Sequence, residues 1–246
     1  MNPPLLELRG LSKSFGGVVA NDDITLSVAQ GAIVGLIGPN GSGKTTLFNC
    51  VTAHCPLDSG TVHFGGHALA RQSTAQIARL GLVRTFQQAG VYEARTCLQG
   101  MQISVSHARE SYGALLRRPD SAARALELLD FVGLAAQSDQ LAGELSYGQR
   151  KLLEFAMALM TNPRMLLLDE PTAGVSPTLL PALIERLRRA NAELGITLLV
   201  IEHNMQVVMG LAQQIFCLAR GRVLAEGTPA EIRADPRVTG AYLGGA

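Results

Sequence analysis

The sequence predicts an α/β fold with a mainly parallel sheet that is covered by helices on both faces. Three short, mostly apolar runs have the length of buried strands, namely Ala32–Ile37, Met165–Leu168 and Thr197–Ile201. Two longer segments, Gly43–Ala53 and about Thr178–Leu194, have helical patterns and lie between these runs. Strands that are buried on both faces and joined by helical crossovers are typical of a parallel sheet.

The composition fits one large domain and excludes some classes of function. The chain has 246 residues, of which 47% are hydrophobic and 17% are charged, so a substantial core is expected and global disorder is not. The formal net charge is +1, which argues against a protein that binds nucleic acid through a strongly basic surface. We therefore expect no nucleic-acid partner.

The cysteines and the apolar runs indicate the cellular compartment and whether the chain spans a membrane. Cys50, Cys55, Cys97 and Cys217 form no C-x-x-C pair and no zinc-site spacing, so reduced and mostly buried thiols are expected. The first residues lack the basic start and apolar stretch of a signal peptide. No apolar run approaches the roughly 20 residues that span a bilayer. Any membrane role is therefore expected to come through partners.

The region from about Thr96 to Gly143 differs from the rest of the chain. Residues 122–129 read AARALELL, a strong helix former with apolar spacing, and no convincing strand is found in this region. It is interpreted as a helical lobe inserted into the α/β core. Near the end of the chain, Thr228 and Glu231 have the spacing of a capping box, with Pro229 at the first helical position. A short helix is predicted to begin there.

Residues 38–46 read GPNGSGKTT and match the phosphate-binding pattern G-x-x-x-x-G-K-[ST], between a predicted strand and a predicted helix. Glycines allow the backbone to curl around phosphate oxygens, and the helix N-terminus attracts anions. Lys44 is expected to reach the β- and γ-phosphates, and the Thr45 hydroxyl to bind Mg²⁺. The alternative is a glycine-rich turn that only connects strand to helix. The predicted nucleotide-binding residues of the loop are Gly38, Pro39, Asn40, Gly41, Ser42, Gly43, Lys44, Thr45 and Thr46.

Two carboxylates follow the buried run that begins at Met165. Asp169 lies where an acid at the end of a strand holds Mg²⁺ beside a P-loop. Glu170 follows directly, where it can orient and deprotonate an attacking water. The alternative interpretation is a strand end with two solvated acids that have no role in catalysis. This interpretation would be favoured if the chain had no P-loop. The pair therefore indicates nucleotide hydrolysis.

Residues 145–149 read LSYGQ and narrow the class of P-loop protein. Ser146 and Gln149 have the spacing of a capping box at the start of a helix through Met160, and such a helix end is also an anion site. Because the segment lies between the P-loop and Asp169, it also resembles the signature motif L-S-G-G-Q of ABC ATPases, with Tyr147 in place of the first glycine. The resemblance implies that Ser146, Gly148 and Gln149 contact nucleotide.

Further residues resemble ABC ATPase motifs in the same order along nearly the whole chain. Gln87, in RTFQQ, matches the glutamine that contacts Mg²⁺ and the attacking water. His203, in IEHN, matches the histidine that contacts the γ-phosphate. Phe15, in SFGG, matches the aromatic residue that stacks on adenine. Without this context, an exposed loop glutamine, a structural histidine and a core phenylalanine would be the ordinary interpretations. The resemblance implies catalytic roles for Lys44, Gln87, Glu170 and His203, and Mg²⁺ ligands at Thr45, Gln87 and Asp169.

The resemblance is strongest to the ATPase subunits of branched-chain amino-acid importers, through RTFQ, LSYGQ, EPTAG, IEH and the ending GTPAEIRADPRVTGAYLG. It implies one ABC ATPase domain over 1–246, with a P-loop NTPase core in 1–95 and 162–246 and a helical lobe with the signature motif in about 96–161. It also implies an antiparallel β subdomain near the N-terminus. ATP and Mg²⁺ are the implied cofactors. The implied location is peripheral, at the cytoplasmic face of the inner membrane.

The implied mechanism is a head-to-tail dimer that binds two ATP molecules between the P-loop of one chain and the signature helix of the other. The expected partners are transmembrane permease subunits, a second ATPase subunit in a homo- or heterodimer and, indirectly, a substrate-binding protein. The loop after Gln87, Ala89–Arg95, is expected to carry the motion to the permease. Alternatives are urea or amide import, lipid-type export, a soluble ABC ATPase without transport, a nucleotide kinase and a non-hydrolysing binding module. The last two fit poorly, because neither explains the signature together with Glu170 and His203.

One segment departs from the family pattern. The family usually has S-A-L-D, or a variant ending in Asn, after the residues that correspond to Glu170–Thr172. Here residues 173–176 read AGVS. Because the usual acid contacts the opposite subunit, Ser176 puts the strength of that contact in doubt. Ser176 followed by Pro177 is also predicted to act as the N-cap and first residue of the next helix.

Overall fold

The computed structural model describes residues 3–85, 90–108 and 120–243, and its strands form two sheets. The smaller sheet is antiparallel wherever its strands pair, in the order β2-β1-β4-β5. Its strands are β1 (Leu6–Phe15), β2 (Val18–Val28), β4 (Ser59–Phe64) and β5 (His67–Ala68). The antiparallel β subdomain expected near the N-terminus is therefore confirmed.

The larger sheet has the order β10-β9-β3-β8-β7-β6 and is parallel from β9 to β6. Its strands are β3 (Ile33–Ile37), β6 (Leu82–Thr85), β7 (Met165–Asp169), β8 (Thr197–Ile201), β9 (Gln214–Ala219) and β10 (Arg222–Gly227), and β10 pairs antiparallel with β9. The three strands predicted from the sequence are the adjacent strands β3, β8 and β7. Every residue in them is buried.

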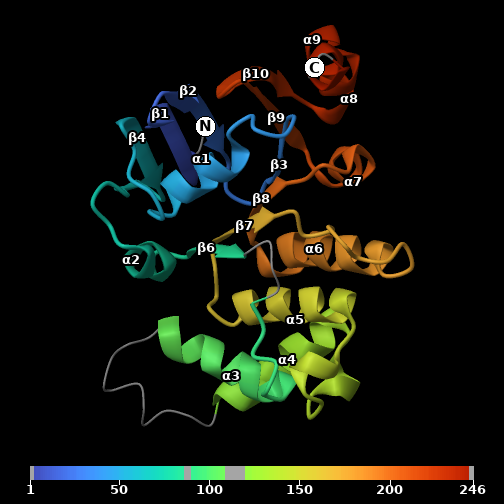
Figure 1. Ribbon diagram of the computed structural model, residues 1–246. Helices are drawn as coiled ribbons and strands as arrows, with labels where there is room; N and C mark the ends of the chain where they lie inside the picture. The colour runs from blue at the N-terminus through green and yellow to red at the C-terminus, as the bar shows by residue number, and fades with distance from the viewer. Residues whose placement is uncertain (1–2, 86–89, 109–119, 244–246) are drawn as a thin grey trace.

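Alternate side chains of the central strands pack into two different hydrophobic cores, one on each face of the sheet. In β7, Leu166 and Leu168 pack with the helical region, while Met165 and Leu167 pack with α1 (Lys44–Val51) and the antiparallel sheet. This period of two is the reason that the strand is apolar throughout. Figure 1 shows α1 beside the antiparallel sheet, and α6 (Leu180–Leu194) below the central strands.

Between β6 and β7, the described residues form helices and no strand. These helices are α3 (Cys97–Ala108), α4 (Asp120–Val132) and α5 (Tyr147–Leu159), with short 3-10 turns at Ala135–Gln137 and Ala142–Glu144. Ala125, Leu128, Leu129 and Val132 give α4 one apolar stripe, and all four are buried. Figure 1 shows these helices gathered at one end of the molecule. The proposed boundaries of the lobe, about 96–161, remain a prediction.

The other helices of the described residues flank the larger sheet, and two of them follow its last strand. They are α2 (Thr74–Arg79), α7 (Met205–Leu211), α8 (Pro229–Ala234) and α9 (Pro236–Leu243). The predicted capping box of α8 is present, since the Glu231 N–H donates to Thr228 Oγ1 at 3.3 Å and the Thr228 N–H donates to Glu231 Oε2 at 2.7 Å. Within the described ranges, no helix has both the length and the apolar character needed to cross a bilayer.

The prediction that Ser176 caps the helix was wrong. Helix α6 begins at Leu180, with Leu179 at the N-cap position and no side-chain capping bond. The Ser176 carbonyl, rather than its hydroxyl, accepts from the Leu179 and Leu180 N–H groups at 3.0 and 3.1 Å. The hydroxyl lies 3.0 Å from Thr178 Oγ1. The tight turn built by Pro177 and Thr178 delays the helix by one turn.

The four cysteines are free, and Cys50, Cys97 and Cys217 are buried, as expected for reduced core thiols. Burial raises the pKa of Cys50 to about 12 and that of Cys217 to about 11. Thiols with such raised pKa values stay protonated at neutral pH and are poor nucleophiles. These residues therefore contribute to packing and carry none of the chemistry of the site.

Candidate nucleotide-binding and hydrolysis site

The loop of residues 38–43 joins β3 directly to α1 and has a backbone that only glycine can follow at its two ends. Gly38 has φ 149°, and a Cβ there would lie 2.2 Å from the Leu218 carbonyl oxygen. Gly43 has φ 100°, and a Cβ there would lie 2.2 Å from the Ala20 carbonyl oxygen. Neither position has room for a side chain, because the ends of the loop pack directly against the backbone of β9 and β2.

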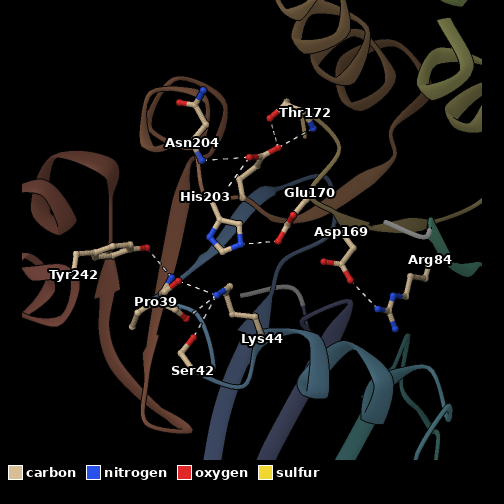
Figure 2. A network of polar contacts seen from close by, with 12 residues as sticks. Pro39, Ser42, Lys44, Arg84, Asp169, Glu170, Thr172, His203, Asn204 and Tyr242 are labelled. Atoms are coloured by element: carbon tan, nitrogen blue, oxygen red, sulfur yellow. Dashed lines mark hydrogen bonds and ion pairs between the residues drawn. The ribbon is translucent and has the colours of Figure 1, made fainter. Parts of the chain in front are cut away.

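Lys44 is the first residue of α1, and its ammonium group lies inside the loop. Nζ donates to the Gly38 carbonyl at 2.8 Å, to the Pro39 carbonyl at 3.0 Å and to Ser42 Oγ at 3.4 Å. Figure 2 shows this cluster below Glu170. Burial lowers the pKa of Lys44, and the negative charges of Glu170 and Asp169 partly offset that effect. The cation and both predicted acids therefore share one electrostatic environment.

Three segments far apart in the sequence hold the loop in place, and none of their contacts was predicted. The buried Asn21 side chain, on β2, donates through Nδ2 to the Gly43 carbonyl at 3.1 Å. The Gly221 N–H, in the turn between β9 and β10, donates to the Ser42 carbonyl at 3.2 Å. Tyr242, on α9, accepts from the Gly38 N–H at 2.8 Å. The only signal in the sequence is a polar Asn21 within a strand.

Asp169 ends β7 and forms a buried ion pair. Its Oδ2 lies 2.7 Å from Nη2 of Arg84, and the two side chains are 3% and 8% exposed. Arg84 also donates through Nη1 to Asn49 Oδ1 at 2.6 Å and lies over the Phe48 ring. Figure 2 shows Arg84 reaching the carboxylate from β6. Arg84 was not predicted as a site residue, although it belongs to the RTFQ segment.

Glu170 follows Asp169 in a left-handed backbone conformation, with φ 51°. Its N–H donates to the Ile201 carbonyl at 2.9 Å, which fixes the turn to the end of β8. Its Oε1 lies 2.6 Å from Nε2 of His203, so the structure brings these two predicted catalytic residues together (Figure 2). Strained backbone of this kind is often retained where it orients a functional side chain.

Glu202 is a buried carboxylate that was not predicted as a site residue. Its Oε1 accepts from the Thr172 N–H at 2.9 Å and from the Thr172 hydroxyl, while Oε2 accepts from the N–H groups of His203 and Asn204 at 3.2 and 3.4 Å. Glu202 therefore ties the turn after Glu170 to the turn that carries His203. It keeps the two catalytic candidates in a fixed relation.

The signature residues lie at the N-terminus of α5. The Gln149 N–H donates to Ser146 Oγ at 3.3 Å and the Ser146 N–H donates to Gln149 Oε1 at 3.0 Å, so the capping-box prediction is confirmed. A Cβ at Gly148 would lie 2.7 Å from Leu179 Cδ1, and a Cβ at Gly174 would lie 2.8 Å from the Tyr147 ring. Tyr147 in place of glycine is thus accommodated by a glycine in the segment after Glu170.

Helix α5 and helix α1 pack on opposite faces of the larger sheet, since they belong to the two separate cores that β7 feeds. Within the described residues, no hydrogen bond joins Ser146, Gly148 or Gln149 to residues 38–46. In the part of the chain that the structure describes, the helix that carries the signature motif and the helix that follows the P-loop therefore belong to different cores.

The last candidates are Phe15, Thr45 and Gln87. Phe15 ends β1 and is 51% exposed, with Lys13 Nζ 5.2 Å from the ring centroid. Val18 and Val19 lie beside it across the strand pair and are also exposed. Thr45, in the first turn of α1, is exposed. Gln87 lies outside the described residues, so its predicted place in the site is not tested.

Together, the fold and this site define a P-loop protein that binds a nucleotide. A sequence profile of the ABC transporter family matches residues 21–173. A second profile, for branched-chain amino acid ATP-binding cassette transporters, matches residues 222–246. The chain belongs to the ABC transporter family, and as its ATP-binding cassette it is an ATP-hydrolysing enzyme.

Curated relatives are similar over almost their whole length. The high-affinity branched-chain amino acid transport ATP-binding protein LivG of Salmonella typhimurium is 37% identical over 253 residues, covering 99% of each chain. The corresponding protein BraF of Pseudomonas aeruginosa is 39% identical over 256 residues, again covering 99% of each chain. These identities extend the match beyond the shared nucleotide motifs.

Solved structures agree with the fold. A nucleotide-free ATP-binding cassette from an ABC transporter superposes with a TM-score of 0.87 at 33% identity, covering 96% of this chain and 97% of that one. The ADP conformation of an ATP-binding cassette superposes with a TM-score of 0.88 at 33% identity, covering 98% and 99%. The predicted P-loop NTPase fold of the ABC type is confirmed.

Proposed function

We propose that this chain is the ATP-binding and ATP-hydrolysing subunit that energises an importer of branched-chain amino acids. The contact between Glu170 and His203, above the ammonium group of Lys44, carries the hydrolytic part of the proposal. The full-length similarity to LivG and BraF supports the class of cargo. The alternatives are related systems that import urea or amides, or that export lipids. Transport measurements distinguish them from an amino-acid importer.

The loop and its acids fit a triphosphate with Mg²⁺. Lys44 is the cation inside the loop and is proposed to contact the β- and γ-phosphates. Asp169 and the exposed Thr45 offer hard oxygen ligands, and Mg²⁺ is commonly held by one or two carboxylates together with substrate phosphates. Among the described residues, no group of three or more acidic, histidine or cysteine side chains forms a complete metal cage. Asp169, Thr45 and Gln87 are thus the proposed ligands, and the ion would neutralise phosphate charge.

Hydrolysis is assigned to Glu170 and His203. Glu170 is proposed to take the proton of the water whose oxygen attacks the γ-phosphorus, while the bond to the bridging oxygen of ADP breaks. His203 holds Glu170 through the 2.6 Å contact and is proposed to reach the γ-phosphate, with Gln87 orienting the water. Phe15, exposed with Val18 and Val19, is proposed to stack on adenine.

The separation of α5 from α1 supports the proposal of a dimer. Ser146, Gly148 and Gln149 lie on the face of the sheet opposite to α1, so we propose that they cover the γ-phosphate held by another ATPase chain. The proposed partners are a second ATPase subunit, identical or different, and transmembrane permease subunits that receive cargo from a substrate-binding protein. The proposed location is the cytoplasmic face of the inner membrane.

The partners and the cargo are tested together by purification from native membranes. We expect the tagged chain to co-purify with permease subunits and a second ATPase, and deletion of its gene to abolish uptake of radiolabelled leucine, isoleucine and valine. Recovery of amino-acid uptake by the wild-type gene but not by Glu170→Gln is the control for ATP dependence. Unchanged leucine uptake in the deletion strain, with loss of urea or amide uptake, would contradict the proposed cargo.

The loop after Gln87 is predicted to matter for coupling more than for hydrolysis. Tyr92 is 39% exposed, whereas Val91 is partly buried against the core, which makes Tyr92 the cleaner probe of the two. The loop is tied to the helical region, since the Gly143 N–H donates to the Glu93 carbonyl at 3.1 Å and Arg150 Nη1 lies 3.1 Å from Glu93 Oε1.

We therefore expect Tyr92→Ala to keep the basal ATPase rate of the purified chain and to lose most amino-acid uptake in cells. Leu194→Ala, which removes another exposed apolar side chain at the end of α6, should leave both activities unchanged. An equal loss of hydrolysis and uptake in Tyr92→Ala would show that this loop does not face the permease.

A further inference from the structure

Gly38 connects the phosphate-binding lysine to the rest of the fold through both of its backbone groups. Its carbonyl oxygen accepts from Lys44 Nζ at 2.8 Å. A Cβ at this position would lie 2.2 Å from the Leu218 carbonyl oxygen and 2.7 Å from Ser42 Oγ, so the Gly38 Cα is enclosed on that side. The backbone conformation of this residue, which joins two consecutive peptide groups, thus places an acceptor that holds the ammonium group.

The other backbone group of Gly38 is held from the far end of the chain. Its N–H donates to Tyr242 Oη at 2.8 Å, across 204 residues of sequence (Figure 2). Tyr242 lies on α9, which packs against β10 and α8. Burial raises the pKa of Tyr242 to about 12, so the phenol keeps its proton at neutral pH and accepts through a lone pair.

The loop has different supports at its two ends. Asn21 and Gly221 donate to the carbonyls of Gly43 and Ser42, in the second half of the loop. Among the described residues beyond β10, only Tyr242 hydrogen-bonds to residues 38–46, and it does so at the first residue of the loop. The first residue of the loop is therefore held by α9 as well as by Lys44.

We propose that Tyr242 is a positioning residue for nucleotide binding: by accepting from the Gly38 N–H, it fixes the peptide before Gly38 and so the residue whose carbonyl, in the next peptide, orients the Lys44 ammonium group toward the phosphates. The proposal rests on the proposed role of Lys44 as a phosphate ligand. A phenol that only anchored α9 to the core would change the stability of the chain and leave its affinity for nucleotide unchanged. Positioning changes the affinity.

The test compares three variants of the full chain by calorimetric titration with ADP. Tyr242→Phe keeps the ring and removes the acceptor, so its affinity for ADP should fall about two- to tenfold, the range of one net hydrogen bond. Its KM for ATP should rise by a similar factor while kcat stays within about twofold. Thr239→Val removes a hydroxyl from the same helix, in the same groove as Tyr242, and should bind like the wild type. Lys44→Ala should lose more affinity than Tyr242→Phe.

Amide hydrogen exchange supplies a second readout that a mere anchor would not give. The Gly38 amide should be protected in the nucleotide-free wild type, and its protection should be lost in Tyr242→Phe at a nearly unchanged melting temperature. An exposed Gly38 amide in the folded wild type would overturn the proposal without any variant. So would wild-type ADP affinity in Tyr242→Phe, or an equal loss in Thr239→Val. If Lys44→Ala kept full affinity, the phosphate role of Lys44 would fail first and the positioning role with it.

Discussion

The Glu170→Gln chain is expected to bind ATP and to hydrolyse it about 10²–10⁴-fold more slowly than the wild type, the usual cost of losing a general base. Glutamine has nearly the same shape, and its amide oxygen can still accept from His203 Nε2, which lies 2.6 Å from Glu170 Oε1. The left-handed backbone at residue 170, with φ 51°, also stays available to it. The loss should therefore reflect the missing charge rather than a rearranged site.

The same substitution should favour the closed dimer. If Glu170 lies beside the γ-phosphate as proposed, its carboxylate is expected to repel that phosphate, and closure on ATP should become easier once this repulsion is removed at each site. Size-exclusion chromatography with light scattering, with and without ATP, should then show an ATP-dependent dimer of the variant. High salt should weaken this dimer only if screened surface charges dominate its formation.

Two controls separate the possible outcomes for Glu170→Gln. Glu185→Gln removes a charge from an exposed carboxylate on α6 and should hydrolyse ATP at the wild-type rate. A variant that stays monomeric in ATP is to be mixed with the second ATPase subunit from the native complex. Dimer formation only in that mixture would identify a heterodimer, and wild-type hydrolysis by Glu170→Gln would show that Glu170 is not the base.

The sequence patterns predicted correctly those features whose conformation depends on residues close together in the sequence. The glycines and Lys44 of the P-loop, the buried strand that ends in Asp169 and the capping box at Ser146 each rest on neighbours within a few residues. The fully buried parallel strands were recognisable because both of their faces feed a core. The fold class was therefore predictable from the amino-acid sequence.

The supports of the site were not predictable, because they join distant segments. Arg84 meets Asp169 across 85 residues, and Tyr242 meets Gly38 across 204. Glu202 lies next to His203 in sequence, yet its role depends on Thr172, which is 30 residues away. The prediction for Ser176 was wrong for a related reason. A serine before proline is typical of a helix N-cap, but the turn that follows Ser176 determines where the helix begins.

The Arg84–Asp169 pair also gives the largest expected effect on stability. Both side chains are almost fully buried, at 8% and 3% exposed, and the atoms Nη2 and Oδ2 lie 2.7 Å apart. Arg84 is further held by Asn49 and by the face of Phe48. Breaking a buried pair by removing one partner leaves an uncompensated charge, which costs about 3–5 kcal/mol.

Arg84→Met should therefore lower the free energy of unfolding by about 3–5 kcal/mol, measured by urea denaturation of the nucleotide-free chain. The loss should lie toward the lower end of that range, because the charge of Asp169 also acts on Lys44. Arg9→Met is the matched control. Arg9 pairs with Glu7 at 2.7 Å but is 68% exposed, and such surface pairs contribute at most about 1 kcal/mol.

The double variant Arg84→Met with Asp169→Asn separates the lost charge pair from lost packing. If the buried uncompensated carboxylate causes the loss, removing its charge should restore much of the stability that Arg84→Met alone removes, so the two effects are not additive. If Arg84 contributes mainly by packing on Phe48, the double variant should be at least as unstable as the single one. A loss below about 1 kcal/mol in Arg84→Met would contradict both explanations, because it would place the pair among ordinary surface contacts.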